Sequence, residues 1–255
     1  MSTTHDFTDR VVLVTGAGSG IGRATAHAFA AAGATVVVAG RSKDALDETV
    51  ELVRADGGSA TAIAVDVTDE VQVQALVEEV VRTHGRLDVA HNNAGVFPAP
   101  RPLGDLDTRT WEDTVAVNLT GVFHTLRAEV AAMKPRGGGV IVNTSSNIGA
   151  HGRRPGVAAY AASKAAVSTL TAVAALDHIG DGIRINAVSP GATATRMSLR
   201  PGETEEDRAQ RLAGVVPIGR VGEIDEVVAA VLWLASDASS FVVGQDIVVD
   251  GGVTA

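Results

Sequence analysis

The chain contains 255 residues and no cysteine, and 21 basic against 30 acidic residues give it a formal net charge of −9. This acidic balance argues against a surface for nucleic acid or anionic membranes. The lack of cysteine excludes disulfides, thiolate catalysis and cysteine-based zinc sites. The length suits one large α/β domain over residues 1–255, and 45% hydrophobic but only 3% aromatic residues predict an aliphatic core.

The start of the chain, MSTTHDFTDR, is polar and charged, which is not the pattern of a signal peptide. No apolar run approaches the roughly 18 residues that a membrane-spanning helix requires. We therefore expect a soluble, cytoplasmic protein.

Short valine-rich runs alternate with longer amphipathic stretches along the chain. We predict helices at 21–33, 42–58 and 158–180, and seven strands at 10–16, 34–40, 59–67, 86–95, 138–146, 182–191 and 244–252. Continuous apolar strands separated by helices indicate a parallel sheet that is covered on both faces. The predicted fold is a single-domain, Rossmann-like, doubly wound α/β sheet of seven parallel strands. Ligands of such folds bind beyond the carboxyl ends of the strands.

A glycine-rich turn, TGAGSGIG (15–22), joins the first predicted strand to the first helix. Backbone N–H groups and the helix N-terminus there can hold a pyrophosphate. The spacing is G-x-x-x-G-x-G through Gly16, Gly20 and Gly22, with Ser19 and Ile21 between them. We predict that all five residues bind a dinucleotide; the alternative is an ordinary glycine-rich turn.

The end of the second strand, ATVVVAGRS, bears on the choice of dinucleotide. NAD enzymes commonly place an acidic residue there, which binds the ribose 2′-hydroxyl. Here Gly40 takes that position and Arg41 follows. A guanidinium can bind a 2′-phosphate with charge assistance, so we predict NADP(H), with NAD as the alternative. Arg41 lying along the adenine or in solvent is the competing interpretation.

The segment AAYAASKAAV (158–167) contains the only tyrosine, Tyr160, four positions before Lys164. This spacing puts both side chains on one face of a helix. A nearby cation favours tyrosinate and lowers the phenol pKa, which suits general acid–base catalysis near pH 7. Taken alone, a packed tyrosine and a solvated lysine would be the better explanation of the pair.

Other motifs follow in a fixed order: NNAG (92–95), VNLTG (117–121), VNTSS (142–146), SPGATAT (189–195) and GQDIVVDGG (244–252). Together with the glycine turn and Tyr160-x-x-x-Lys164, they make nearly the whole chain resemble the short-chain dehydrogenase/reductase family. The resemblance implies hydride transfer between a nicotinamide cofactor and a secondary alcohol or ketone. It also implies a homodimer or homotetramer. A non-catalytic dinucleotide sensor or scaffold on the same fold is the alternative function.

The resemblance assigns four catalytic residues. Tyr160 is the acid/base, Lys164 also holds the nicotinamide ribose, and Ser146 donates to the developing oxyanion. Asn118 positions Lys164 through a water relay. Ser146 lies three residues before Gly149, the usual family spacing, but its distance to Tyr160 is one residue longer than usual, so the neighbouring Ser145 is an alternative.

Further cofactor contacts are implied by the same resemblance. Asp66 and Val67 would lie at the adenine, and Asp66 acting as a loop or helix-cap residue is the alternative. The remaining predicted contacts are Asn92, Ala94 and Gly95 at the adenosine ribose, Pro190 and Gly191 beside the nicotinamide, and Thr193 and Thr195 at the carboxamide and phosphates. A plain turn role is the alternative for both threonines. Ser19 stands where NADP-using members often carry a basic residue. The seven histidines show no H-x-x-x-H spacing, so we predict no metal site.

Three regions bear on the substrate and on assembly. The polar stretch 196–217 interrupts the strand–helix pattern on the ligand side, so we predict a substrate lid there. The segment VFPAPRPLGDL (96–106) has three prolines and few donors, which hints at a moderately apolar ligand. Helix 158–180 carries nine alanines between positions 158 and 175, a face that suits close packing against a second subunit. His151, Arg153 and Arg154 either border the substrate or lie in a solvated loop.

Overall fold

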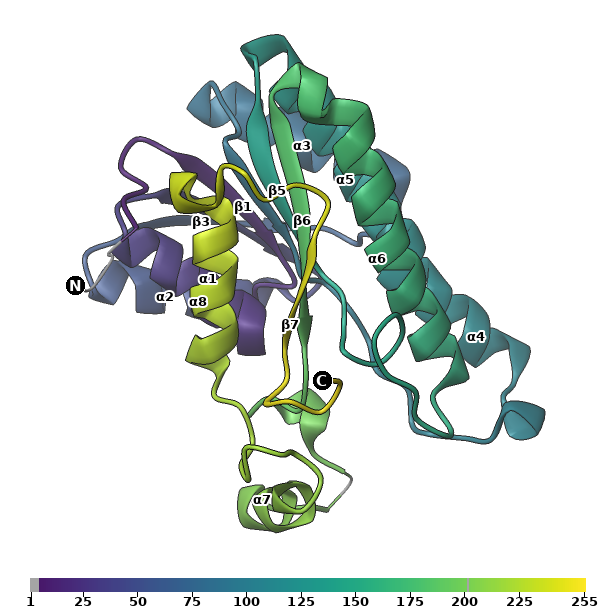
Figure 1. Ribbon diagram of the computed structural model, residues 1–255. Coiled ribbons are helices and arrows are strands. Elements are labelled where there is room, and N and C mark those ends of the chain that lie inside the picture. The colour runs from purple at the N-terminus through teal and green to yellow at the C-terminus, as the bar shows by residue number, and fades with distance from the viewer. Residues whose placement is uncertain (1–4, 201) are drawn as a thin grey trace.

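The computed structural model describes residues 5–200 and 202–255, so the first four residues of the polar start and position 201 of the predicted lid lie outside it (Figure 1). All seven strands are parallel and are arranged in the order β3-β2-β1-β4-β5-β6-β7. They are β1 (Val11–Thr15), β2 (Thr35–Gly40), β3 (Ser59–Ala64), β4 (Val89–Asn92), β5 (Gly139–Thr144), β6 (Ile183–Pro190) and β7 (Asp246–Val249). The predicted sheet is confirmed. The observed strands are shorter than predicted because motifs such as NNAG leave the sheet to form its ligand edge.

Helices cover both faces of the sheet (Figure 1). They are α1 (Gly20–Ala31), α2 (Lys43–Ala55), α3 (Glu70–His84), α4 (Thr108–Val115), α5 (Gly121–Met133), α6 (Ala158–His178), α7 (Glu205–Ala213) and α8 (Ile224–Ala235). The strand order reverses direction between β1 and β4, and in doubly wound sheets this switch point opens the ligand crevice. The glycine turn and the NNAG segment follow these two strands, so the fold places both motifs at that crevice.

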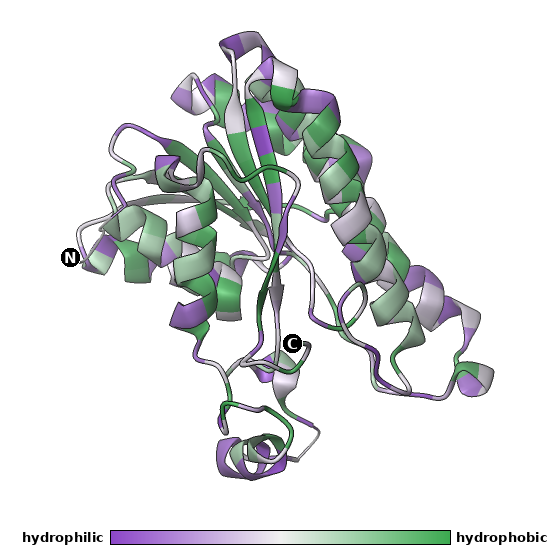
Figure 2. Ribbon diagram, in the orientation of Figure 1, coloured by the Kyte–Doolittle hydropathy of each residue, from purple (hydrophilic) through white to green (hydrophobic). Residues whose placement is uncertain are grey.

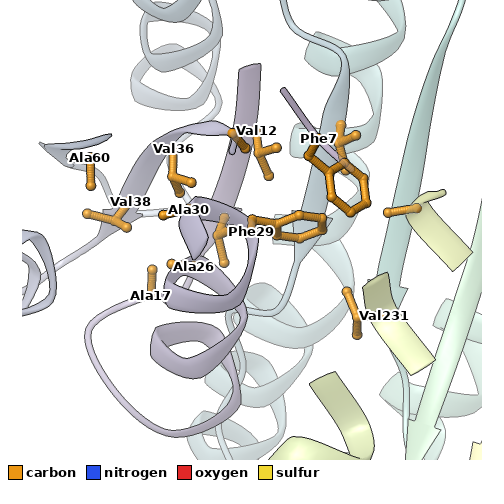
Figure 3. Packing of buried hydrophobic residues seen from close by; sticks show 14 of the residues in the cluster. Phe7, Val12, Ala17, Ala26, Phe29, Ala30, Val36, Val38, Ala60 and Val231 are labelled. Carbon is orange, nitrogen blue, oxygen red and sulfur yellow. The ribbon is translucent and has the colours of Figure 1, made fainter. Parts of the chain in front are cut away.

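The core forms two layers because side chains alternate along each strand. Val12 and Val14 of β1 pack under α1, α2 and α8, whereas Leu13 packs under α3, α5 and α6. In the first layer the rings of Phe7 and Phe29 meet edge to face, with centroids 4.8 Å apart (Figure 3). Figure 2 shows apolar strands and inner helix faces, with hydrophilic residues turned outward.

Helix α6 corrects the expectation that no apolar run approaches the length of a membrane-spanning helix. The stretch Ala158–Asp181 is long and apolar enough to pass for a membrane span by length and composition, with a mean hydropathy of 1.2. However, its polar residues Ser163, Lys164 and Thr171 are buried within the domain. Alanine-rich composition thus produces the apolar signal, and in the fold this segment is a core helix that carries site residues.

A buried polar network lies beneath the site, between the sheet and its helices. The carboxyl group of Glu129 on α5 is fully buried and accepts a hydrogen bond from the Asn92 amide at 2.8 Å. The same amide donates to Asn143 at 3.0 Å, and Asn143 donates to Thr171 at 2.9 Å. Burial raises the pKa of Glu129 to about 8, against the smaller opposing effect of the Asn92 hydrogen bond.

This carboxyl group predicts a pH-dependent stability. The folded protein keeps the Glu129 proton up to pH about 8, whereas the unfolded chain releases it near the usual pKa of 4.5. Its stabilising contribution is therefore fully present below pH 4.5 and is lost as pH rises to about 8. The free energy of unfolding in urea should fall between pH 4.5 and about 8 for the parent, and it should fall less for Glu129→Gln, which cannot ionise at this position. Parallel pH curves for the two proteins would contradict a neutral buried glutamate.

Candidate active site

The glycine turn is built so that backbone, not side chain, faces the crevice. Gly16 has a φ of +65°, and a Cβ atom there would lie 2.8 Å from Ala94 Cα. A Cβ at Gly22 would lie 2.4 Å from the Gly16 carbonyl oxygen. Ile21 between them packs against the core. Ser19 precedes α1 but makes no side-chain cap bond, so the first amides of this helix are left uncapped by it. Uncapped amides at a helix N-terminus fit a pyrophosphate.

The end of β2 carries an exposed cation. Arg41 is exposed and forms no hydrogen bond or ion pair within residues 5–200 and 202–255. The Ser42 hydroxyl accepts the cap bond of α2 from Ala45 N at 3.4 Å, which leaves its own proton to donate. A Cβ at Gly40 would lie 3.9 Å from Gly16 Cα, so this position faces the glycine turn.

Asp66 and Val67 follow β3 at the same edge. One oxygen of the Asp66 carboxylate accepts from both the N–H and the hydroxyl of Thr68, at 3.0 and 2.8 Å. This contact supports the local loop role that was the alternative, and the adenine contact of Asp66 stays a prediction. Asp69 is the residue that caps α3. Val67 is buried.

The NNAG segment gives one correction. Asn92 is 1% exposed and its amide is bonded to Glu129 and Asn143, so its side chain faces the core and not a ribose. We leave it out of the proposed cofactor contacts. The next residue, Asn93, donates to the carbonyl of Gly16 at 3.4 Å and thereby supports the glycine turn.

Ala94 and Gly95 connect the turn to the catalytic region. The Ala94 N–H donates to the Thr15 hydroxyl at 3.2 Å. A Cβ at Gly95 would lie 3.3 Å from Asn118 Oδ1 and 3.7 Å from Lys164 Nζ. The absence of side-chain bulk at Gly95 therefore keeps the space in front of these two polar groups open.

The residues predicted to be catalytic come together just beyond the end of β5. The Ser146 hydroxyl lies close enough to Tyr160 to lower the pKa of the phenol, and the Ser146 oxygen accepts from Ile148 N at 3.1 Å. The Lys164 ammonium donates to the Thr144 carbonyl at 2.7 Å. Tyr160, Lys164 and Ser146 are 8%, 3% and 5% exposed, so the group is shielded from water.

Asn118 lies in a π-helical segment, Ala116–Thr120, between α4 and α5. Its side chain binds both backbone groups of Val96, accepting from N at 2.8 Å and donating to O at 2.9 Å, and it also donates to the Ser163 hydroxyl at 3.3 Å. None of these contacts reaches Lys164 directly. Asn118 therefore anchors the chain after NNAG, as a residue in a distorted helix can do.

Ser145 points away from this group. Its hydroxyl lies 2.9 Å from the Lys164 carbonyl and 2.8 Å from the Ser168 hydroxyl, on the inner side of α6. Only Ser146 of the two serines acts on the pKa of Tyr160. The geometry thus supports the register through Gly149 and the extra residue in the following loop.

Burial dominates the protonation behaviour of the site. It raises the pKa of Tyr160 above its usual value, and the Ser146 hydrogen bond opposes this only in part. It lowers the pKa of Lys164 to about 8, against the charge of Asp246. The expected net lowering of the Tyr160 pKa is therefore wrong for this structure, because desolvation of the phenolate is the largest effect on that pKa. At neutral pH the pair is a phenol beside an ammonium.

Residues after β6 border the crevice opposite the glycine turn. Pro190 ends the strand and Gly191 follows it. Thr193 is 4% exposed and donates to the Gly191 carbonyl at 3.1 Å, which is the turn role given above as its alternative. Thr195 lies over the glycine turn, with its methyl 3.5 Å from a Cβ placed on Gly20.

The region 196–217 contains a short 3₁₀ turn, Arg196–Ser198, and α7. Helix α7 starts with a Thr204–Asp207 capping box and stands beyond the end of β6, apart from the helices that cover the sheet (Figure 1). Arg208 of α7 donates to the Thr195 carbonyl at 3.3 Å. This bond links the predicted lid to the cofactor side of the crevice.

Phe97 is a site residue that the sequence analysis missed. Its ring meets Tyr160 edge to face, with centroids 4.7 Å apart and planes at 72°. The preceding residue, Val96, is the one held by Asn118. The available sequence signal was an aromatic residue two positions after NNAG in a chain with few aromatics. Within the described part of the chain, no three His, Asp or Glu residues gather as a metal site would require.

A dinucleotide-type turn and a Ser–Tyr–Lys group at one edge of a doubly wound sheet define a nicotinamide-dependent oxidoreductase. Residues 16–254 match the model of a family described as enoyl-(acyl carrier protein) reductase. The chain belongs to the short-chain dehydrogenase/reductase family. It is an oxidoreductase that transfers a hydride between a nicotinamide cofactor and a secondary alcohol or ketone.

Three similar proteins support this assignment. A cis-4-hydroxycyclohexanecarboxylate dehydrogenase from Sinomonas cyclohexanicum is 42% identical over 249 residues, which are 98% of each chain. A short-chain type dehydrogenase/reductase from Mycobacterium marinum is 37% identical with a TM-score of 0.92, over 98% of this chain and 97% of that one. A 7α-hydroxysteroid dehydrogenase complexed with NADH and 7-oxo glycochenodeoxycholic acid is 33% identical with a TM-score of 0.91, over 100% and 99% of the two chains.

Proposed function

We propose that Tyr160 protonates the carbonyl oxygen of a ketone during reduction and takes the proton back during alcohol oxidation. This role is supported by the burial of Tyr160 in one group with Lys164 and with Ser146, whose hydroxyl acts on the phenol pKa. A raised phenol pKa keeps the proton on Tyr160 at neutral pH, which is the state that an acid needs. The bound nicotinamide supplies or accepts the hydride.

Ser146 and Lys164 complete the proposed chemistry. The Ser146 hydroxyl donates to the substrate oxygen as negative charge develops there, the role of an oxyanion-hole group. The ammonium of Lys164 stabilises the tyrosinate that remains after proton transfer. It would also hold the nicotinamide ribose, in keeping with the crevice left open by Gly95. Asn118 keeps the segment that carries Phe97 in place.

The residues of the crevice support a dinucleotide held by the glycine turn and the N-terminus of α1. Backbone around Gly16, Gly20 and Gly22 would bind the pyrophosphate, and Thr195 lies over it from the opposite side. The NADP(H) preference is supported by the exposed Arg41 and by the free proton of Ser42.

Two variants test the cofactor preference. Arg41→Ala should weaken NADPH by about 10- to 150-fold, the equivalent of about 1.5–3 kcal/mol for a hydrogen bond to a charged group, and should hardly change NADH. Gly40→Asp should turn the preference toward NADH, because its carboxylate accepts from a 2′-hydroxyl and repels a 2′-phosphate. The measurement is the NADPH/NADH ratio of kcat/KM. A parent enzyme that prefers NADH, or an Arg41→Ala change that weakens both cofactors equally, would refute the role.

The substrate class is proposed to be apolar cyclic secondary alcohols and ketones. The Phe97 ring beside Tyr160 offers an apolar surface next to the reacting oxygen. The Sinomonas cyclohexanicum relative acts on a hydroxylated cyclohexane ring. The test follows NAD(P)H absorbance with cyclohexanone and with 2-hexanone, a linear ketone of equal carbon number. Turnover that favours the ring supports the proposal, and equal rates would remove the ring preference.

Two further aspects complete the proposal. We expect a cytoplasmic enzyme that assembles as a homotetramer or homodimer, with exposed Val173 and Leu176 of α6 as apolar contacts. The same absorbance assay distinguishes the enzyme from the alternative, a non-catalytic sensor. A sensor would bind NADPH without turning over any member of an alcohol and ketone panel.

A further inference from the structure

A chain of polar contacts runs from the catalytic helix to the loop between Ser146 and Tyr160. We call residues 147–157 the Ser–Tyr loop. The chain starts at Ser145, whose hydroxyl contacts the Lys164 carbonyl and the Ser168 hydroxyl. Ser168, one turn after Lys164 on α6, donates to Asp246 Oδ2 at 2.5 Å. Because Asp246 begins β7, this part of the chain joins three elements of the fold.

The chain ends in the Ser–Tyr loop. His151 Nε2 lies 2.9 Å from the same oxygen of Asp246, and since a carboxylate only accepts, this nitrogen donates. The loop itself is tight, with Gly149 N bonded to Gly152 O at 2.9 Å and Gly152 N to Asn147 O at 2.7 Å. His151 therefore attaches a compact loop, which directly follows Ser146, to the last strand of the sheet.

The loop has little room to take another position while it is attached. Gly149 has a φ of +140°, and a Cβ there would lie 2.8 Å from Ala165 N and 2.9 Å from Ala161 O. The loop backbone thus rests on α6 at Ala161 and Ala165, the residues that directly follow Tyr160 and Lys164. A shift at His151 would move this contact and, with it, the position of the Ser146 hydroxyl relative to Tyr160.

Removing the hydrogen-bond donors of Asp246 would destabilise the fold, because its carboxylate is mostly buried. Its side chain is 12% exposed, and its second oxygen, Oδ1, is buried with no hydrogen-bond partner among the described residues. A buried charge that loses a partner is strongly destabilising. The two donors on Oδ2, from Ser168 and His151, therefore decide where this carboxylate lies.

We propose that His151 and Asp246 form a positioning pair that holds the Ser–Tyr loop closed against α6 and β7 and so keeps Ser146 in register with Tyr160. The catalytic part of this proposal rests on the proposed roles of Ser146 and Tyr160. Neither residue of the pair is assigned a contact with the reacting atoms.

The first test is physical and needs no substrate. Arg153 is exposed in the loop and is followed by Arg154, so trypsin can cut between them, whereas Pro155 blocks the next bond. His151→Ala and Asp246→Asn should each raise the rate of this cut at least about tenfold, because cleavage follows local opening. Circular dichroism of each variant is the control that checks whether it is folded. Unchanged cleavage in both variants would overturn the pair.

The second test separates positioning from general packing. Both variants should lower kcat about 10- to 100-fold, the scale of misplacing a reacting group, with the Kd for NADPH unchanged. The double variant should be no worse than Asp246→Asn alone, since His151 acts through Asp246, whereas Asp246 also accepts from Ser168 and its charge raises the pKa of Lys164. His151→Gln, which keeps an N–H donor at similar reach, should recover most of the rate. The positioning role would be refuted if the kcat losses of the two single variants added in the double variant. It would also be refuted if His151→Gln had a kcat as low as that of His151→Ala.

A matched pair on the surface provides the control. His27 Nε2 and Asp56 Oδ2 are 2.6 Å apart, with side chains 40% and 66% exposed. His27→Ala and Asp56→Asn should leave cleavage at Arg153 and kcat near the parent values. If Tyr160→Phe proved fully active, the catalytic roles would fail while the cleavage test of the loop would still stand or fall by itself.

Discussion

Tyr160→Phe is expected to lower kcat by roughly 10²–10⁴-fold, the usual contribution of a general acid–base group. The change removes the hydroxyl whose pKa Ser146 lowers, but it keeps the ring that packs edge to face on Phe97. The fold and the glycine turn are not touched by the change. The variant should therefore bind NADPH with the parent Kd and unfold at a similar temperature.

The experiment combines kcat with the substrate preferred by the parent, NADPH binding by fluorescence titration, and thermal unfolding. The binding and unfolding data are the controls, because a misfolded variant would lose all three properties. Activity within about tenfold of the parent would contradict the acid/base role, since general acid–base groups contribute more than this. A loss of NADPH binding would instead place Tyr160 mainly in cofactor binding.

Ser146→Ala is expected to lower kcat by roughly 10²–10³-fold, the scale of removing one oxyanion donor. The hydroxyl is buried beside Tyr160, and a methyl group in its place cannot donate to a developing oxyanion. Loss of the serine also removes the hydrogen bond that opposes the rise in the Tyr160 pKa. Both effects slow proton transfer without changing the cofactor site.

Ser145→Ala is the matched control, because it removes the same atom from the neighbouring residue. Its hydroxyl faces the Lys164 carbonyl and Ser168, so the rate should fall much less. Single-turnover rates of both variants, with NADPH bound in advance, compare the chemical step directly. A reversed order of the two effects would mean that Ser145 is the oxyanion donor and that the register drawn through Gly149 is wrong.

Much of the fold could be predicted because the relevant signals are local. Valine-rich runs such as RVVLVTG (10–16) are apolar at every position, as strands covered on both faces must be. The glycine turn is equally local, since Gly16 and Gly22 leave no room for a side chain in their own neighbourhood. The motif order then implied Ser146, Tyr160 and Lys164, and the structure brings these three residues together.

Strand ends were harder to predict, because the direction of a side chain depends on the pleat and not on the residue type. Adjacent residues of a strand point to opposite faces. Ser145 and Ser146 are chemically equal in the sequence, yet one faces α6 and the other Tyr160. For the same reason Asn92 turns into the core toward Glu129, although its motif suggested a ribose contact.

The sequence by itself determined the sheet, the glycine turn and the catalytic residue types, because each depends on neighbours within a few positions. Only the tertiary structure decided the protonation of the site, since burial raises the Tyr160 pKa more than Ser146 lowers it. It alone also paired His151 with Asp246, residues 95 positions apart, and Glu129 with Asn92, 37 positions apart. Contacts across such separations follow from strand order and helix packing. No repeat or spacing in the sequence predicts which polar groups these bring together.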